Sequence, residues 1–396
     1  MSETPSTAPL SRTPLIDFHR AHGAHLVPFA GWEMPLYYTS IVAEHNAVRT
    51  NVGLFDVGHM GILTVNGTSA DGLLSRRTAA NAGRLGTGQV RYTFFLESEG
   101  RIVDDLLITR LDVGDRPEHR FLTVPNAGRA AEIQLLLEQH RHPDTTVSRW
   151  NDVATILAVQ GPNSRALLEK TMGWSLGDLK FYTGRFFPAD PRPGSARPGR
   201  NGGSIPQDLG TEIFVSRTGY TGELGFELFV AREQAVALAE SFVAAGANPT
   251  GLGARDTLRL EKGYLLSGQE FYRDRTPIEA AQEKFVEFDH PFVGRPALEK
   301  QVAEGPVERL AGLRVLEDGA IPRHGTPILH DGQPVGVATS GGLSPSLHVG
   351  IALGYLPRAL TEVGTRVEMD VRGRRAPAEV VRLPFYPAST PKPPAR

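Results

Sequence analysis

Residues 100–109 read Gly100-Arg101-Ile102-Val103-Asp104-Asp105-Leu106-Leu107-Ile108-Thr109. A Gly-Arg turn here runs directly into an apolar, β-branched segment, which predicts a strand with two adjacent carboxylates near its start. Side chains alternate along a strand, so Asp104 and Asp105 should point to opposite faces, and only one of them can face a given site. Asp is also common beside turns because it bonds to the local backbone, so other parts of the chain must decide between a structural and a functional role.

The sequence on either side predicts the partners of this strand. Residues 90–96 are rich in β-branched and aromatic side chains, and residues 97–100 form a turn, so the two segments should pair as a hairpin. Residues 121–124 predict a further strand. Asn126 follows it and is a candidate N-cap for an amphipathic helix that runs to about His140.

The composition excludes several classes of function. The chain has 396 residues, enough for two or three domains, and its lack of Cys excludes disulfides, thiolate metal sites and a cysteine nucleophile. Its 42 basic and 44 acidic residues are dispersed and do not predict binding to nucleic acid, so we expect a small-molecule or protein partner. Residues 1–14 lack the apolar core of a signal peptide and no apolar run could span a membrane, so we expect a cytoplasmic protein without membrane contacts.

Two segments have unusual composition. His19, His22 and His25 are spaced by three and could share a helical face, but no further ligand lies at a companion spacing, so we expect buried or capping histidines and no metal site. Residues 186–210 alternate Pro with Gly, Ser and Arg, which predicts a surface loop or disordered insertion without a function of its own.

Two polar positions later in the chain are candidates for a binding site. Glu227 lies between two apolar residues in a predicted strand, so it faces away from them, and a carboxylate on a covered face needs hydrogen-bond donors. Arg255 and Arg259 lie four residues apart in a predicted helix that ends at Gly263, so they share a face. Surface ion pairs with neighbouring acids would explain the two arginines equally well.

The character of the sequence changes again near residue 305. Short β-like runs then recur between Gly and Pro turns, which is typical of a small all-β barrel or sandwich. These runs are residues 310–316, 334–339, 351–355, 366–371 and 378–383. We therefore expect one region at 13–304, a second domain at 305–387, and flexible tails at 1–12 and 388–396.

Several motifs together resemble the T-protein of the glycine cleavage system, the tetrahydrofolate-dependent aminomethyltransferase family. They occur in order along almost the whole chain, and several are long enough to make chance agreement remote. The matching segments are residues 29–35, 44–49, 53–61, 100–106, 219–223, 254–261 and 344–347.

The resemblance implies an α+β fold, a three-domain cloverleaf in which two interleaved α/β subdomains surround a central folate cavity and a C-terminal antiparallel β-barrel follows. It implies transfer of the one-carbon unit from the aminomethyl-lipoyl arm of H-protein to tetrahydrofolate, giving 5,10-methylenetetrahydrofolate, ammonia and dihydrolipoyl H-protein. Tetrahydrofolate is then the acceptor substrate, with no metal and no pyridoxal phosphate. Glycine decarboxylase and dihydrolipoyl dehydrogenase are the implied functional associates.

The resemblance also assigns site residues. The family's catalytic aspartate matches Asp105, where a carboxylate can accept a proton and stabilise nearby positive charge. Glu227 would meet the two-donor edge of the pterin ring, and Arg255 would contact the ligand. Further carried-over binding residues are Met60, Tyr92, Asn126, Tyr220 and Tyr386. The chain departs from the family at Lys284, where a Trp is usual, and in the length of residues 186–210.

Two other functions remain open from the sequence. One is a folate-dependent demethylase that acts on a small N-methyl or S-methyl compound. The other is a non-catalytic, folate-binding accessory protein of the same superfamily, which we would expect to lack the motifs around Asp105 and Arg255.

Overall fold

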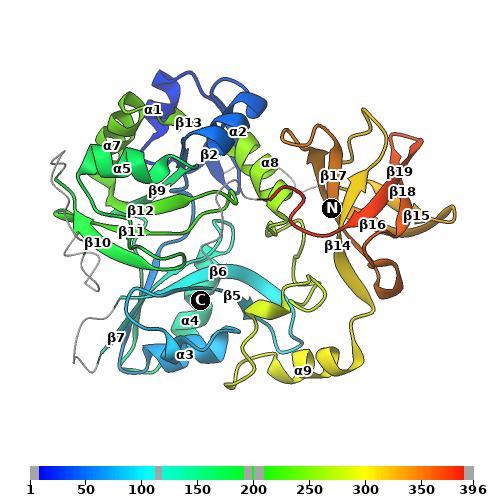
Figure 1. The fold of residues 1–396 in the computed structure, drawn as a ribbon. Coiled ribbons are helices and arrows are strands. Elements are labelled where there is room, and N and C mark those ends of the chain that lie inside the picture. Colours follow the sequence, from blue (N-terminus) through cyan, green and yellow to red (C-terminus); the bar gives the residue numbers. More distant parts are fainter. Residues whose placement is uncertain (1–8, 112–117, 191–198, 200–208, 388–396) are drawn as a thin grey trace.

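The computed structural model describes residues 9–111, 118–190, 199 and 209–387. Within these residues the chain forms sheets of six, five and two strands and a closed six-stranded barrel. In Figure 1 the six-stranded sheet lies above the five-stranded sheet, and the barrel, drawn in orange and red, lies to the right of both. The predicted fold class, mixed α/β units followed by a C-terminal antiparallel barrel, is confirmed.

The five-stranded sheet contains the predicted hairpin. Its strands, in spatial order, are β5 (Val90–Leu96), β6 (Ile102–Arg110), β7 (His119–Val124), β4 (Leu63–Gly67) and β8 (Thr146–Arg149). Helices α3 (Ala70–Arg77) and α4 (Ala130–His140) pack on one face, where Leu106 and Ile108 of β6 join their core. Leu107 packs on the other side, against the core that includes the second sheet. Strand alternation therefore places Asp104 on the helix side and Asp105 on the side of Leu107.

The six-stranded sheet is assembled from segments far apart in the sequence. Its order is β10 (Gly184–Pro188), β11 (Glu212–Ser216), β12 (Gly225–Ala231), β9 (Ala154–Gln160), β3 (Gly53–Asp56) and β13 (Asn248–Pro249). Helices α1 (Ile16–Ala21), α5 (Ser164–Met172) and α7 (Arg232–Ala244) cover one face. Phe214 and Phe229 lie on the other face, in a core shared with Leu122 of β7. The two sheets are therefore packed together by apolar side chains.

Two helices and a hairpin connect this pair of sheets to the barrel. The hairpin consists of β1 (His25–Phe29) and β2 (Trp32–Tyr37), and α2 (Ile41–Thr50) packs on α8 (Leu252–Lys262). Helix α8 ends at Gly263, whose φ of 71° is the left-handed C-terminal geometry that the sequence predicts. Helix α9 (Arg295–Glu304) and the short turns η1 (Ala82–Arg84) and η2 (Glu283–Phe285) complete this part of the chain.

The C-terminal unit is a closed antiparallel barrel. Around it run β14 (Glu308–Val315), β17 (Gly350–Pro357), β16 (Gln333–Leu343), β15 (Pro327–His330), β18 (Arg366–Val371) and β19 (Arg374–Val381), with η3 (Arg358–Leu360) after β17. Five of these strands overlap predicted β-like runs. The sixth, β15, was missed because four residues are too few to show an alternation pattern.

Three local predictions were wrong. Asn126 does not cap α4, because the helix begins at Ala130 and its N-cap position is Arg129. The insertion at 186–210 does not begin at Phe186, because Phe186 and Phe187 belong to β10 and are fully buried. Most of the remaining insertion, the predicted tail at 388–396 and residues 1–8 of the predicted tail at 1–12 lie outside the described residues. Residues 9–12 are described, and Ser11 forms backbone hydrogen bonds with Gly31 and Glu33, so the tail was predicted to extend too far. No helix in the part of the chain that the structure describes is long and apolar enough to cross a membrane.

The barrel is joined to the rest of the molecule through the buried carboxylate of Glu261 in α8. Arg49 donates to Glu261 Oε2 from Nη2 at 2.7 Å and from Nε at 3.2 Å. From the barrel side, the Ser344 hydroxyl donates at 2.5 Å, and Ser346 donates through its backbone N–H and hydroxyl, each at 2.9 Å. Burial alone would raise the pKa of Glu261, but the hydrogen bond and charge of His45, with these donors, lower it to about 2.

We predict that Glu261→Gln destabilises the protein by about 3 kcal/mol at pH 7, because it removes one of the two buried carboxylates, Glu261 and Glu223, that pair with the Arg49 guanidinium. The folded-state pKa of Glu261 lies below its ordinary value of 4.5, so its contribution is present above pH 4.5 and is lost as the pH falls toward 2. Urea unfolding at pH 7 and pH 4 should therefore show a smaller difference from wild type at pH 4. Glu304→Gln, at an exposed residue, is the control, and a difference independent of pH would contradict the prediction.

Candidate functional site

Asp105 is held by one donor on each of its carboxylate oxygens. The side-chain amide of Asn126 donates to Oδ1 at 2.6 Å, and the Tyr92 hydroxyl donates to Oδ2 at 2.7 Å. Tyr92 lies on β5, and Asn126 lies just after the end of β7, so the two donors approach Asp105 from opposite neighbours of β6. Asp105 is partly exposed, and the Tyr92 hydroxyl and the Asn126 amide fix the orientation of its carboxylate.

The surroundings of Asp105 make it harder to ionise than an exposed carboxylic acid. Burial raises its pKa, and the hydrogen bonds from Tyr92 and Asn126 only partly offset that effect. The adjacent Asp104 is fully buried, and burial followed by the charge of Asp105 raises its pKa to about 8. Two neighbouring carboxylates, one buried and one partly exposed, repel each other when both are ionised, and such repulsion is a common origin of proton-transfer groups that work near neutral pH.

Glu227 and Arg255 form a second polar group, on the six-stranded sheet and on α8. The Thr218 hydroxyl donates to Glu227 Oε2. Its oxygen also lies 3.0 Å from the Ser216 hydroxyl oxygen. Because the Thr218 hydroxyl has a single hydrogen, it bonds to the carboxylate, which is the stronger acceptor. Burial raises the pKa of Glu227, while Thr218 and the charge of Arg255 lower it. As predicted from alternation, Glu227 faces away from Phe226, which is buried in the core beneath the helices.

The guanidinium of Arg255 forms no ion pair with an acid among the residues that the structure describes. Its guanidinium carbon lies 4.6 Å from the centre of the Tyr220 ring, and no hydrogen bond or ion pair joins it to another of the described residues. Burial lowers its pKa, while Tyr220 and Glu227 raise it. The Tyr220 ring stacks on Tyr264 at 5.6 Å, and its hydroxyl donates to the Leu265 carbonyl. The arrangement leaves guanidinium N–H groups available for a ligand.

Charge effects connect the Asp105 group to the Glu227 group. Burial raises the pKa of Tyr220, and the charge of Asp105 raises it further, while Arg255 lowers it. Burial also raises the pKa of Tyr182, to which Glu227 adds. Burial raises the pKa of Tyr92, and Asp105, Tyr220 and Tyr182 raise it further. Charge effects of this kind act over short distances, so these side chains from β5, β6, β12, α8 and the loop after β11 lie near one another.

Met60 and Tyr386 lie at different distances from this region. Met60 packs beside the apolar core that Leu107 also touches, and its carbonyl accepts from Asn151 at 2.8 Å. The Tyr386 ring lies 5.1 Å from the Arg49 guanidinium, and its backbone N–H donates to the Glu261 carbonyl at 3.1 Å. Tyr386 therefore stands at the junction with the barrel, and Met60 beside the site residues on β6.

Sequence reasoning missed three residues of this region. Tyr182 has a left-handed φ of 57°, an unusual conformation for Tyr, and no sequence signal indicates it. Phe285 packs edge-on against Tyr92 at 4.8 Å, and its neighbour Lys284 is exposed, so an aromatic contact exists beside the departure at Lys284. His59 is buried, with Nδ1 unpartnered among the described residues, and burial and Arg255 lower its pKa to about 4.

The three N-terminal histidines have separate partners. His19 is buried between Asp56 and the Tyr38 hydroxyl, each 2.8 Å away. His22 lies 3.2 Å from Glu240 on α7, and His25 stacks on Tyr37 at 5.1 Å. In the described ranges, no cluster of three or more His, Asp or Glu side chains could hold a metal ion.

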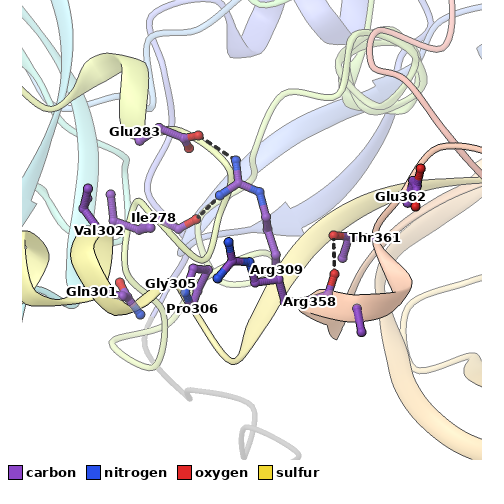
Figure 2. A pocket seen from close by; sticks show the side chains of 11 residues that line it. Ile278, Glu283, Gln301, Val302, Gly305, Pro306, Arg309, Arg358, Thr361 and Glu362 are labelled. Carbon is purple, nitrogen blue, oxygen red and sulfur yellow. Dashed lines mark hydrogen bonds and ion pairs between the residues drawn. The ribbon is translucent and has the colours of Figure 1, made fainter.

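A hollow of about 870 Å³ lies elsewhere, between α9, β14 and η3 (Figure 2). Arg309 spans one side of it, donating to the Ile278 carbonyl at 3.1 Å and to Glu283 at 2.6 Å. The residues that line this hollow include Gln301, Val302, Pro306, Arg358 and Glu362, but none of the predicted site residues. It is therefore separate from the Asp105 region.

Comparison with known proteins gives a consistent result over the whole chain. The model of the GCVT N-terminal domain matches residues 15–190 and 207–290, and that of the glycine cleavage T-protein C-terminal barrel domain matches residues 308–387. The first match breaks between residues 190 and 207, within the Pro-rich segment. Aminomethyltransferases of Prochlorococcus marinus (strain MIT 9313) and Halothermothrix orenii are 42% and 40% identical over 95% of this chain and 98% and 100% of their own lengths.

A solved structure agrees with these relatives. The crystal structure of the glycine cleavage system aminomethyltransferase T from Bartonella henselae matches with a TM-score of 0.83 and 34% identity, over 95% of this chain and 98% of that chain.

We predict that Thr218→Val raises the pKa of Glu227 further, because it removes the hydroxyl that stabilises the carboxylate, and that it costs about 1–2 kcal/mol of folding free energy. The pKa can be followed by NMR of carboxyl-labelled Glu, and Glu227→Gln assigns the signal. Thr64→Val is a matched control, since the Thr64 hydroxyl is buried without a partner among the described residues. An unchanged titration of Glu227 would contradict the role given to Thr218.

Proposed function

Because this chain belongs to the glycine cleavage T-protein family of aminomethyltransferases, we propose that the residues around Asp105, Glu227 and Arg255 bind tetrahydrofolate and transfer a one-carbon unit to it. The donor is the aminomethyl group on the lipoyl arm of H-protein, and the products are 5,10-methylenetetrahydrofolate, ammonia and dihydrolipoyl H-protein. The chain contains no Cys, so the sulfur that carries the aminomethyl group must belong to the partner.

Asp105 is the residue that we assign to catalysis. Its carboxylate can accept a proton or hydrogen bond from the attacking nitrogen and stabilise positive charge that develops beside it. The donors Asn126 and Tyr92 occupy one position on each oxygen, at 2.6 Å and 2.7 Å, and leave the remaining lone pairs for a ligand. A carboxylate fixed on both sides does not have to reorganise during the reaction, which lowers the barrier.

Glu227 and Arg255 are assigned to binding. The pterin ring presents a ring N–H beside an exocyclic amino group, and a carboxylate can accept both of these donors at once. Glu227 has one oxygen bonded to Thr218 and remains partly exposed. Arg255, held over Tyr220, can donate to an acceptor of the same ligand. Met60 and Tyr386 remain candidates for its periphery.

The single observation that carries this proposal is that Asp105, held by a donor on each oxygen, and Arg255 both act on the pKa of the same residue, Tyr220, in a chain of this family. The test is formation of 5,10-methylenetetrahydrofolate from tetrahydrofolate and aminomethyl-loaded H-protein. Free N-methyl and S-methyl compounds serve as alternative donors. Turnover with these compounds and none with loaded H-protein would favour a demethylase instead.

We predict that Asp105→Asn lowers turnover at least about 100-fold and changes the dissociation constant of tetrahydrofolate by less than about tenfold, because it removes charge but little shape. Stopped assays with loaded H-protein and fluorescence titration with tetrahydrofolate measure the two effects. Asp17→Asn, at an exposed residue of α1, is the control. Wild-type turnover in Asp105→Asn would refute the catalytic assignment.

We predict the opposite pattern for Glu227→Gln. A hydrogen bond to a charged group contributes about 1.5–3 kcal/mol, so tetrahydrofolate should bind roughly 10- to 100-fold more weakly, while turnover at saturation falls much less. Isothermal titration gives the dissociation constant and steady-state kinetics give kcat, with Glu304→Gln as the surface control. Unchanged affinity would remove Glu227 from the binding site.

A further inference from the structure

Asp104 has no access to a substrate, yet its contacts lead directly to Asp105. It is fully buried on the helix side of β6. Both of its oxygens accept from one residue: the Asn126 amide donates to Oδ1 at 2.8 Å, and the Asn126 backbone N–H donates to Oδ2 at 2.9 Å. Asp104 therefore fixes both the backbone and the side chain of Asn126.

The Asn126 amide is shared between the two carboxyl groups. Its nitrogen lies 2.8 Å from Asp104 Oδ1, 2.6 Å from Asp105 Oδ1 and 3.1 Å from the Asp105 carbonyl. An amide has two hydrogens, so three acceptors compete for two donors. Side-chain alternation turns the two carboxyl groups to opposite faces of β6. Asn126 lies just beyond the end of β7, and its amide nitrogen is within hydrogen-bond distance of both carboxyl groups. They are therefore coupled through one amide.

The surrounding charges do not neutralise two anions. Arg129 is the cation whose charge lowers the pKa of Asp104, but it also donates to Glu132 at 3.2 Å and lies 4.5 Å from the Tyr272 ring. On the other side, Tyr92 donates to Asp105, and the charge of Glu270 disfavours its ionisation. Burial and mutual repulsion therefore oppose a second negative charge in the pair.

We propose that Asp104 is a positioning residue for the transfer reaction: it holds Asn126 against Asp105, and the two carboxyl groups share a single proton near neutral pH. The inference rests on the proposed function only for its kinetic consequence. Asp104 touches no reacting atom; it determines where the Asp105 carboxylate points and how many protons the pair carries. The pair then titrates as a unit with macroscopic pKa values, and neither residue has an independent one.

The shared proton can be tested without any substrate, by infrared difference spectroscopy of the full chain between pH 5 and 10. We expect the C=O band of a protonated carboxylic acid at pH 7, lost on titration toward pH 9. Asp104→Asn and Asp105→Asn should each remove this band or lower its midpoint by at least about one pH unit, because each removes the neighbouring charge. Glu227→Gln should leave it in place. Absence of the band in wild type, or an unchanged midpoint in Asp105→Asn, would overturn the proposal.

The positioning role is tested by kinetics with loaded H-protein. Asparagine offers one acceptor oxygen where Asp104 offers two, so Asp104→Asn should lose a bond to Asn126 and lower kcat roughly tenfold, with less than about threefold change in the tetrahydrofolate dissociation constant. The ionisation of the Asp104–Asp105 pair should also be absent from the dependence of kcat on pH in Asp104→Asn. Thr123→Val, which replaces a buried β7 hydroxyl without a partner among the described residues, is the matched control.

A loss of kcat in Asp104→Asn with the wild-type pH profile would reduce Asp104 to a structural residue and overturn the inference. An inactive wild-type enzyme would instead overturn the proposed function, while the infrared result would still decide whether the proton is shared.

Discussion

The buried carboxylate of Glu261 is the interaction on which the arrangement of the units depends. It accepts from Arg49 on α2 and from Ser344 and Ser346 in the barrel, so three parts of the chain meet at one side chain. An ion in such a place is tolerated only when every lone pair has a donor. Six residues earlier on the same helix, Arg255 faces Tyr220. The contact that attaches the barrel therefore lies on the same helix as the cation that we propose for the binding site.

The need of buried polar groups for hydrogen-bond partners also governs the candidate site. Here buried or partly buried polar groups have fewer hydrogen-bond partners than they can use: Asp104 and Asp105 share one amide, and among the described residues the Arg255 guanidinium contacts an aromatic ring and pairs with no acid. Such groups are costly in an apolar interior unless a ligand or a proton completes them. The surrounding strands and helix hold these groups in place, so their unused hydrogen-bonding capacity stays available for the ligand that we propose.

Sequence reasoning predicted the parts of the structure that short-range patterns determine. The β5–β6 hairpin, the Gly263 helix end and most barrel strands follow from alternation and turn residues. The role of Asn126 did not, because a local cap and a long-range bond to β6 look alike in sequence. Strand β10 was hidden by the Pro-rich composition that follows it. Tyr182 and His59 were missed because their positions depend on contacts between distant segments, which leave no periodic signal.

The order of strands in the six-stranded sheet has a consequence for biosynthesis. Strand β3, at Gly53–Asp56, pairs with β9 and with β13 at Asn248–Pro249, and both of these strands are synthesised later. The five-stranded sheet, in contrast, has all its strands once β8 ends at Arg149. As the chain leaves the ribosome, the Asp105 hairpin can therefore form a native domain core well before Glu227 and Arg255 have been translated. Early nascent chains therefore contain Asp104 and Asp105 but neither Glu227 nor Arg255, and the two halves of the proposed site can meet only after α8 has emerged.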